Sequence, residues 1–209
     1  VPERAFDVRR GDVVYVPPHY AHDGVGCSDS ITCSIGFRAP SRQEICQGFL
    51  AWMQDEIAST GREFTDRYSD PDLALQRHPA RIAGAMLERI ETMIGELRWR
   101  RADVARYLGQ YLTEPKPQTW FTPPPQPLGF GSFLRKARRD GVKLALKSRM
   151  LFDDRSVFIN GERTRIPSQG RAALIDLADR RALAPWPPAA DAIAATLHEW
   201  YKAGYVELA

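Results

Sequence analysis

The sequence lacks any long apolar run. No stretch of about 18 consecutive apolar residues occurs, so we expect no membrane-spanning helix, and charged side chains throughout residues 1–16 argue against a secretory signal. Cysteine is scarce as well: the 209 residues hold three, and Cys27, Cys33 and Cys46 match no zinc-ligand spacing. Three scattered thiols favour a reducing compartment, and we expect a cytoplasmic protein.

Common catalytic motifs are also missing. The sequence contains no H-x-D pair, no H-E-x-x-H, no G-x-S-x-G and no phosphate-binding glycine loop. The net charge of +3 is too small to indicate a nucleic-acid partner by itself. The chain begins at Val1 and runs almost at once into a predicted strand, so we expect it to be the later part of a longer protein.

Residues 1–40 are predicted to form strands and turns. In "GDVVYVPPHYAHDG", residues 11–24, β-branched and aromatic side chains indicate a strand, which two prolines end. In "SITCSIGFR", residues 30–38, apolar side chains alternate with the hydroxyls of Thr32 and Ser34. One apolar face and one hydroxyl face suit a barrel with a polar interior.

Residues 41–113 are predicted to be helical. Ser41 and Glu44 have the spacing of a capping box, and apolar residues recur behind them at helical intervals. Two further apolar stripes follow, the last of which is predicted to point Leu108 and Leu112 inward. These helices carry many large apolar side chains, so they pack either on the barrel or on a second copy of themselves.

Six prolines within residues 114–131 predict an extended, stiff linker. Residues 132–209 then read as a small α+β module that begins with a short helix ended by Gly141. A strand is predicted over residues 142–151, and Asn160-Gly161 is a favoured two-residue hairpin turn. Two helices and a last strand complete a winged-helix-like pattern.

Histidine is the side chain of interest in the first segment. An isolated histidine beside a strand is more often structural than a ligand, although imidazole is the commonest metal-binding side chain. A zinc site built on His19 and His22 would need two further ligands. Asp23 precedes a glycine and reads as a turn residue. The residues alone therefore leave both a structural and a metal-binding role open for His22.

The chain resembles the later part of the bacterial ribosomal oxygenases, which are JmjC-type cupin, 2-oxoglutarate- and Fe(II)-dependent protein hydroxylases. The resemblance rests on "YVPPHYAH", "SIGFRAP", "YSDPD" with "HPA", and "VFINGERTRIP", in this order along nearly the whole chain. It implies an α+β fold with four parts: the end of a JmjC/cupin double-stranded β-helix barrel (1–40), a helical dimerisation domain (41–113), the linker (114–131) and a winged-helix-like domain (132–209).

The resemblance also implies roles for single residues. His22 matches the later iron ligand of the family, and Thr32 and Ser34 are expected to hydrogen-bond the cosubstrate 2-oxoglutarate, with two ordinary strand hydroxyls as the alternative. The family's H-x-D pair would lie before Val1, so the fragment alone is expected to be inactive. The middle helices are implied to form a homodimer, with an intramolecular core as the alternative. The candidate interface residues are Phe49, Trp52, Met53, Ile82, Met86 and Ile90.

The implied function is hydroxylation of a ribosomal protein side chain, with arginine as the expected target. A non-catalytic cupin binding module and a winged-helix nucleic-acid binder are the alternatives. The predicted last helix, within residues 191–204, argues against DNA reading because it holds one lysine against two acids. The run 135–149 holds seven basic residues and one acid, which indicates a solvated face by default, or else a weak contact with ribosomal RNA or a contact with an unassembled ribosomal protein.

Overall fold

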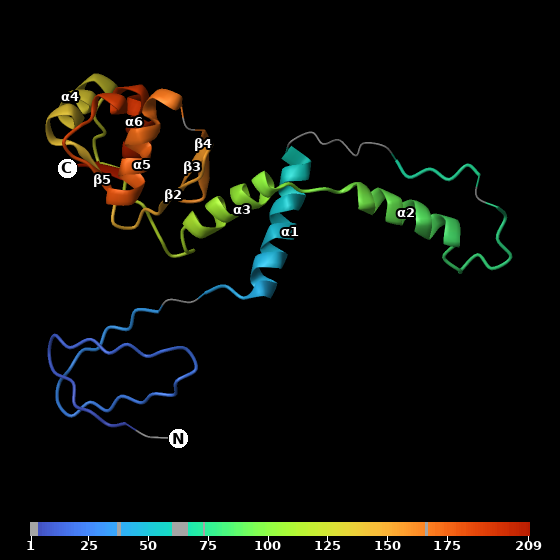
Figure 1. The fold of residues 1–209 in the computed structure, drawn as a ribbon, viewed down its shortest axis with the longest axis horizontal. Coiled ribbons are helices and arrows are strands. Elements are labelled where there is room, and N and C mark those ends of the chain that lie inside the picture. Colours follow the sequence, from blue (N-terminus) through green and yellow to red (C-terminus); the bar gives the residue numbers. More distant parts are fainter. Residues whose placement is uncertain (1–3, 37–38, 60–66, 73, 166) are drawn as a thin grey trace. The chain divides into compact units, whose positions relative to one another are not determined.

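The computed structural model describes residues 4–36, 39–59, 67–72, 74–165 and 167–209. The chain divides into two compact units, residues 1–40 and residues 41–209. The helices of the second unit (Figure 1) are α1 (Arg42–Ser59), α2 (Gly84–Glu96), α3 (Arg101–Thr113), α4 (Phe130–Asp140), α5 (Arg171–Arg180) and α6 (Ala194–Ala203), with short 3-10 turns at η1 (Ser168–Gly170) and η2 (Pro188–Ile193). Its strands are β1 (Val142–Leu144), β2 (Met150–Phe152), β3 (Ser156–Ile159), β4 (Glu162–Arg165), β5 (Ala182–Leu183) and β6 (Val206–Leu208). None of the helices described is both long enough and apolar enough to cross a bilayer.

The first unit holds turns but no paired strand within residues 4–36. The strands expected within 11–24 and 30–38 are therefore wrong for the described residues; positions 37–38 lie outside them. A strand is held by ladder hydrogen bonds from its neighbours, and two short strands by themselves are marginal in water. Without such neighbours the apolar side chains stay exposed, Ile31 to 94%.

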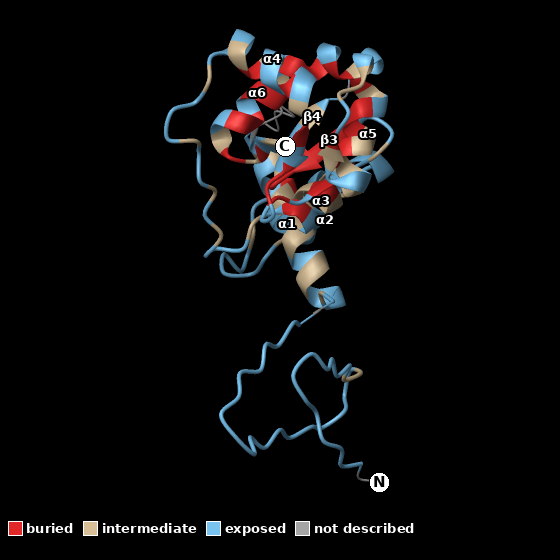
Figure 2. Ribbon diagram, turned by 90° about the vertical axis from the view of Figure 1, so that its left-hand side faces the viewer, coloured by how far each residue is buried: buried red, intermediate tan, exposed pale blue. Residues whose placement is uncertain are grey.

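The C-terminal module contains two antiparallel three-stranded sheets, β5-β1-β6 and β2-β3-β4. Helices α4, α5 and α6 and both sheets contribute to one apolar core, which Figure 2 shows as the densest group of buried residues. Its largest fully buried side chains include Phe133, Leu174, Leu177 and Leu197. This mixture of helices and sheets confirms the predicted α+β class.

The single strand predicted over residues 142–151 is wrong, because the structure has two strands, β1 and β2, in different sheets. The chain turns between them at residues 145–149. The Arg181 guanidinium donates hydrogen bonds to the carbonyls of Ala145 and Ser148, at 2.9 and 3.1 Å. Arg181 is the residue directly before β5. Its side chain, and not a neighbouring strand, therefore bonds these two carbonyls.

The predicted hairpin turn is confirmed. Asn160 and Gly161 join β3 to β4 with φ values of 50° and 86°, the two positive values that this tight turn needs. All four residues of β3 are buried, since the strand is covered on both faces. Val157 and Ile159 belong to the module's core, and the intervening Phe158 faces α3.

Helix α3 approaches the β3–β4 hairpin through its small residues. A side chain at Gly109 would overlap the Phe158 ring, and the Thr113 hydroxyl accepts a hydrogen bond of 3.0 Å from the Gly161 N–H. Leu112 was predicted to point inward but is exposed. The predicted face is wrong there because the buried residues of α3 are Asp103, Tyr107, Gly109 and Thr113, which do not include Leu112.

The capping box at the start of α1 is confirmed. The Ser41 N–H donates to the Glu44 carboxylate at 2.7 Å, and the Glu44 N–H donates to the Ser41 hydroxyl at 3.1 Å. Each contact satisfies an amide that the first helical turn leaves without a backbone partner. Helix α1 therefore starts where its sequence signal places it.

Replacing Gly109 with alanine should destabilise the protein, because the new methyl group must displace the Phe158 ring. We expect the free energy of unfolding to fall by about 1–3 kcal/mol, the usual cost of overfilling a packed site. Denaturant unfolding followed by circular dichroism measures this change.

Gly95→Ala is the matched control, because Gly95 lies in α2 and a methyl group added there would meet no neighbouring side chain or loop within 4 Å. Alanine there should leave stability unchanged or raise it by about 1 kcal/mol through helix propensity. Equal effects of the two substitutions would contradict the packing role of Gly109.

Candidate functional site

The candidate cofactor residues of the first unit are all exposed. His22 lies just past the Pro17-Pro18 turn, and its Nδ1 is 3.4 Å from the Tyr20 carbonyl oxygen. Thr32 and Ser34 are exposed as well. The hydrogen bonds seen among the described residues of this unit are local, between residues two or three positions apart.

The described residues do not by themselves form an iron site. Within them, no three histidine, cysteine, aspartate or glutamate side chains lie close enough together to hold a metal ion. His22 offers one imidazole, whereas iron oxygenase sites of the 2-His-1-carboxylate type need three protein ligands. The three cysteines, Cys27, Cys33 and Cys46, are exposed free thiols.

Three of the six candidate dimer residues lie on α1, and two of them, Phe49 and Trp52, contact α3 within the chain. Phe49 and Trp52 stack at 5.9 Å between ring centroids, and Tyr107 of α3 lies 5.5 Å from Phe49. Met53 is 8% exposed. A side chain at Gly48 would overlap the Tyr107 hydroxyl, so this glycine lets α1 and α3 approach closely.

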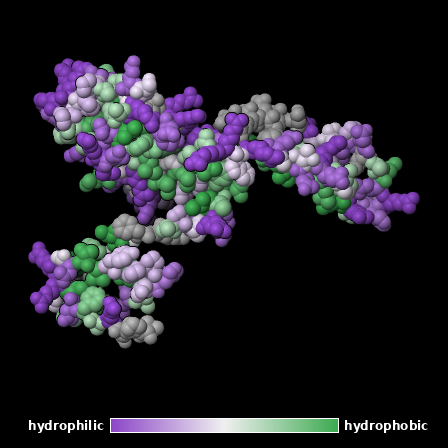
Figure 3. All heavy atoms as spheres, in the orientation of Figure 1, coloured by the Kyte–Doolittle hydropathy of each residue, from purple (hydrophilic) through white to green (hydrophobic). Residues whose placement is uncertain are grey.

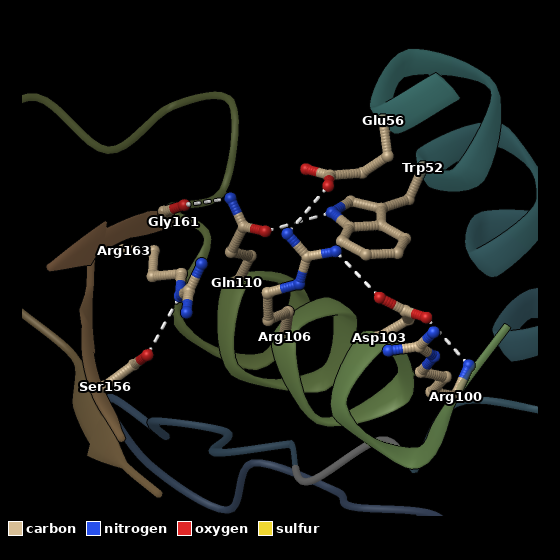
Figure 4. Close-up of polar contacts among 9 residues, drawn as sticks. All are labelled: Trp52, Glu56, Arg100, Asp103, Arg106, Gln110, Ser156, Gly161 and Arg163. Carbon is tan, nitrogen blue, oxygen red and sulfur yellow. Dashed lines mark hydrogen bonds and ion pairs between the residues drawn. The ribbon is translucent and has the colours of Figure 1, made fainter. Parts of the chain in front are cut away.

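A polar network joins α1, α3 and the β3–β4 hairpin (Figure 4). The Trp52 Nε1–H donates to Gln110 Oε1 at 2.9 Å, and Gln110 Nε2 donates to the Gly161 carbonyl at 3.3 Å. Arg106 bridges Glu56 and Asp103, at 2.8 Å to each carboxylate. We call these residues of α1 and α3, with Gly161, the α1–α3 seam.

Arg106 is the central cation of the α1–α3 seam. Its guanidinium carbon lies 5.2 Å from the centroid of the Trp52 ring, a cation–π geometry.

Arg163 on β4 donates to the Ser156 hydroxyl at 2.8 Å. Burial, together with the neighbouring guanidinium groups of Arg106 and Arg165, lowers the pKa of Arg163. Sequence reasoning missed this network, because its members lie far apart in the chain and follow no motif.

The other three candidate dimer residues belong to α2 and the segment before it. Ile82 is 66% exposed, Met86 is exposed, Ile90 is half-buried, and α2 has no fully buried residue. Figure 3 shows hydrophobic residues at the surface along this helix. Ile82 and Met86 also line a shallow hollow with Ala74 and Pro79. Helix α2 therefore presents an apolar face that the described residues do not cover.

Comparison with known families divides the chain into two matched segments. A family model described as ROXA-like winged helix matches residues 96–207, and one described as JmjC domain matches residues 2–45. The winged-helix match begins before α3, in agreement with the packing of α3 on the β3–β4 hairpin.

Curated and solved relatives point the same way. The chain is 28% identical over 179 residues to an Escherichia coli (strain K12) protein named ribosomal protein uL16 3-hydroxylase, covering 85% of this chain and 46% of that protein. It is similar to the crystal structure of the E. coli ribosomal oxygenase YcfD, with a TM-score of 0.62, 25% identity, and coverage of 84% and 48%. The complex of YcfD with cobalt and 2-oxoglutarate gives a TM-score of 0.61, 26% identity, and coverage of 83% and 47%. The chain thus spans about half the length of the curated relative it matches.

Replacing Arg106 with alanine should loosen α1, because it removes two ion pairs and the contact with the Trp52 ring. We expect the free energy of unfolding to fall by about 2 kcal/mol, the range for charge-assisted hydrogen bonds and cation–π contacts that are partly shielded from water. Hydrogen exchange of the α1 amides should become faster in the same variant.

Arg180→Ala provides the comparison. Arg180 is 77% exposed on α5 and pairs with Asp176 at 3.7 Å, so its removal should change stability by less than about 0.5 kcal/mol. If Arg106→Ala has no larger effect than Arg180→Ala, the α1–α3 seam does not hold α1.

Proposed function

The chain belongs to the ROXA-like winged-helix family, whose model matches more than half of its residues, and on this premise we propose that it acts in a 2-oxoglutarate- and Fe(II)-dependent oxygenase. The proposed reaction is hydroxylation of an arginine side chain in a ribosomal protein. One observation carries the proposal: a JmjC match at residues 2–45 precedes the winged-helix match in the same chain. The relative named for hydroxylation of the ribosomal protein uL16 supports that substrate class.

In this proposal His22 is one of three protein ligands of iron. When bound, iron and 2-oxoglutarate would supply the oxidising chemistry with O2: one oxygen atom goes to the arginine side chain and the other to succinate, with release of CO2. Thr32 and Ser34 would hydrogen-bond the 2-oxoglutarate. The H-x-D pair that would complete the ligand set is absent from the 209 residues. We therefore infer that this chain alone does not turn over 2-oxoglutarate.

The proposed partner is a ribosomal protein, which places the reaction in the cytoplasm. DNA reading is not part of the proposal. Helix α6 buries Leu197, Trp200 and Tyr201, and its Lys202 is paired with Glu199 at 2.7 Å. Few side chains of this helix are thus left to contact base edges, which need exposed Arg, Lys, Asn or Gln.

We also propose that the protein is a homodimer, formed through the apolar face of α2. Phe49 and Trp52 contact α3 within the chain and Met53 is buried, so the proposal rests on Met86 and Ile90 of α2 and on Ile82 before it. Apolar faces of this kind are typical of obligate interfaces, which resemble a protein core cut in half.

Replacing His22 with alanine tests the enzymatic proposal, in the polypeptide that also contains the H-x-D pair. Iron content, 2-oxoglutarate turnover and hydroxylation of uL16 should each fall at least about 10- to 100-fold, because even the loss of a side chain that only supports a ligand costs this much. Metal analysis, succinate release and mass spectrometry of the ribosomal protein measure the three quantities.

His19→Ala is the matched control, since His19 lies in the turn just before His22 and is exposed. This substitution is expected to leave all three quantities unchanged. Iron content and hydroxylation that survive His22→Ala would exclude His22 as a ligand. Ribosomal proteins of unchanged mass in cells with and without the gene would exclude the substrate class and favour a non-catalytic cupin module.

Charged residues on α2 should separate the dimer. Met86→Glu combined with Ile90→Glu places two carboxylates on the proposed interface, where burying unpaired charge is strongly unfavourable. Light scattering at micromolar concentration should give a dimer mass for the unaltered protein and a monomer mass for this variant. Thr92→Glu adds charge on the other side of the same helix and should leave the dimer intact; an unaltered protein of monomer mass would refute the proposal.

A further inference from the structure

The loop between β1 and β2, residues 145–149, is held firmly although it lies at the surface. Two of its carbonyls accept hydrogen bonds from Arg181. The Ser148 hydroxyl donates to the Tyr205 carbonyl at 2.8 Å and accepts from Asn160 Nδ2 at 3.2 Å. Because its backbone is already ordered, the loop can bind a partner without a large loss of conformational entropy.

This loop presents an apolar and a cationic side chain next to an exposed tryptophan. Leu146 is 96% exposed and Lys147 is exposed. The Lys147 ammonium donates to the Trp120 carbonyl at 3.0 Å, which places residue 120 beside the loop. The Trp120 side chain is itself 76% exposed. Arg149, two residues after Lys147, is exposed too. We call Trp120, Leu146, Lys147 and Arg149 the Trp120–Lys147 surface.

Positive charge is concentrated in the same part of the chain. Residues 135–149 carry seven basic side chains and one acid, whereas the whole chain has a net charge of only +3. Three of the seven are neutralised: Arg138 by Asp191, Arg139 by Asp140 and Lys143 by Glu207. Within the described part of the chain no carboxylate pairs with the others, which are Arg135, Lys136, Lys147 and Arg149. Two of these four cations, Lys147 and Arg149, belong to the Trp120–Lys147 surface. The other two lie in α4, over which Figure 3 shows hydrophilic residues.

We propose that the Trp120–Lys147 surface binds single-stranded RNA. Unpaired RNA alternates flat bases with phosphates, and proteins bind it by stacking bases on aromatic side chains and pairing phosphates with Lys and Arg. The Trp120 ring offers the stacking plane, and Lys147 and Arg149 offer the cations. An acidic peptide would match the cations but would leave the tryptophan plane without a specific partner.

Ribosomal RNA as the source of the strand rests on the proposed function, which brings the protein to ribosomal components. The chemistry of the surface does not depend on it. Duplex DNA fits less well, because its bases are stacked inside the helix and cannot reach Trp120 without unpairing. The surface also contains no residue of α6, half of whose residues are buried.

Direct binding to the 209-residue chain tests the inference. The probe is a single-stranded RNA of about 12 nucleotides, within the usual range for such sites, measured by fluorescence anisotropy at several salt concentrations. Trp120→Ala should weaken binding about 5- to 150-fold, the range that corresponds to the loss of one stacked base, and Trp120→Phe should restore most of the affinity. Lys147→Gln and Arg149→Gln should each flatten the slope of log affinity against log salt by about 0.7.

Two substitutions elsewhere serve as controls. Trp99→Ala removes another exposed tryptophan, and Lys202→Gln removes a cation that is paired with Glu199; both should leave RNA affinity unchanged. Circular dichroism establishes that every variant is folded. Unchanged affinity of Trp120→Ala, equally tight binding of a duplex DNA of the same length, or full competition by polyglutamate would each overturn the inference.

The outcome is separable from that of the proposed function. RNA binding is measured on the isolated chain without iron or 2-oxoglutarate, and hydroxylation is measured on a ribosomal protein. Loss of hydroxylation in His22→Ala leaves the RNA affinity of the chain as it was. Ultraviolet crosslinking in cells should recover ribosomal RNA on the chain, and recovery of other RNA in its place would overturn ribosomal RNA as the source.

Discussion

The close approach of α3 to Phe158 is the contact on which the arrangement of the second unit depends. It is possible because Gly109 has no side chain, and it gives β3 a second buried face beyond the one that meets the module's core. The other side of α3 receives α1, where Gly48 leaves room for Tyr107. One helix thus connects α1 to the β3–β4 hairpin through two glycines that no helix-propensity argument would favour.

The polar groups between α1, α3 and the β3–β4 hairpin make the packing of α1 on α3 specific to one register. Ring stacking alone would tolerate sliding of α1 along α3, whereas the bonds from Trp52 to Gln110 and from Gln110 to the Gly161 carbonyl fix one register. Arg106 satisfies two carboxylates that would otherwise lie between the helices at a cost in desolvation. The seam is therefore specific as well as apolar, and it joins the helical segment to the winged-helix module.

The two units differ in how much of their stabilising contact lies within them. The C-terminal module buries a complete core among α4, α5, α6 and its two sheets. Residues 4–36 have no comparable core, and their exposed Val13 and Ile31 are side chains that suit a sheet. The candidate iron ligand lies in this unit, whereas the proposed dimer face and RNA surface lie in the other. The proposed iron ligand and the proposed dimer and RNA contacts thus lie in different units of the chain.

Local signals in the sequence determined the features that short-range physics controls. The Ser41–Glu44 capping box and the Asn160-Gly161 turn are both formed, because each depends on hydrogen bonds or dihedral angles within a few residues. The family resemblance, carried by "YVPPHYAH" and "VFINGERTRIP", identified the class of protein and the mixed fold. Tertiary structure alone decided the rest. Residues 142–151 alternate like one strand, but the chain turns at residues 145–149, where Arg181 donates hydrogen bonds to the carbonyls of Ala145 and Ser148. Helix α3 buries Gly109 and not Leu112, because α1 and the β3–β4 hairpin pack on faces of α3 that do not include Leu112. Within the described residues 4–36 no paired strand forms, since the sequence pattern specifies a face but a strand exists only where another strand accepts its hydrogen bonds.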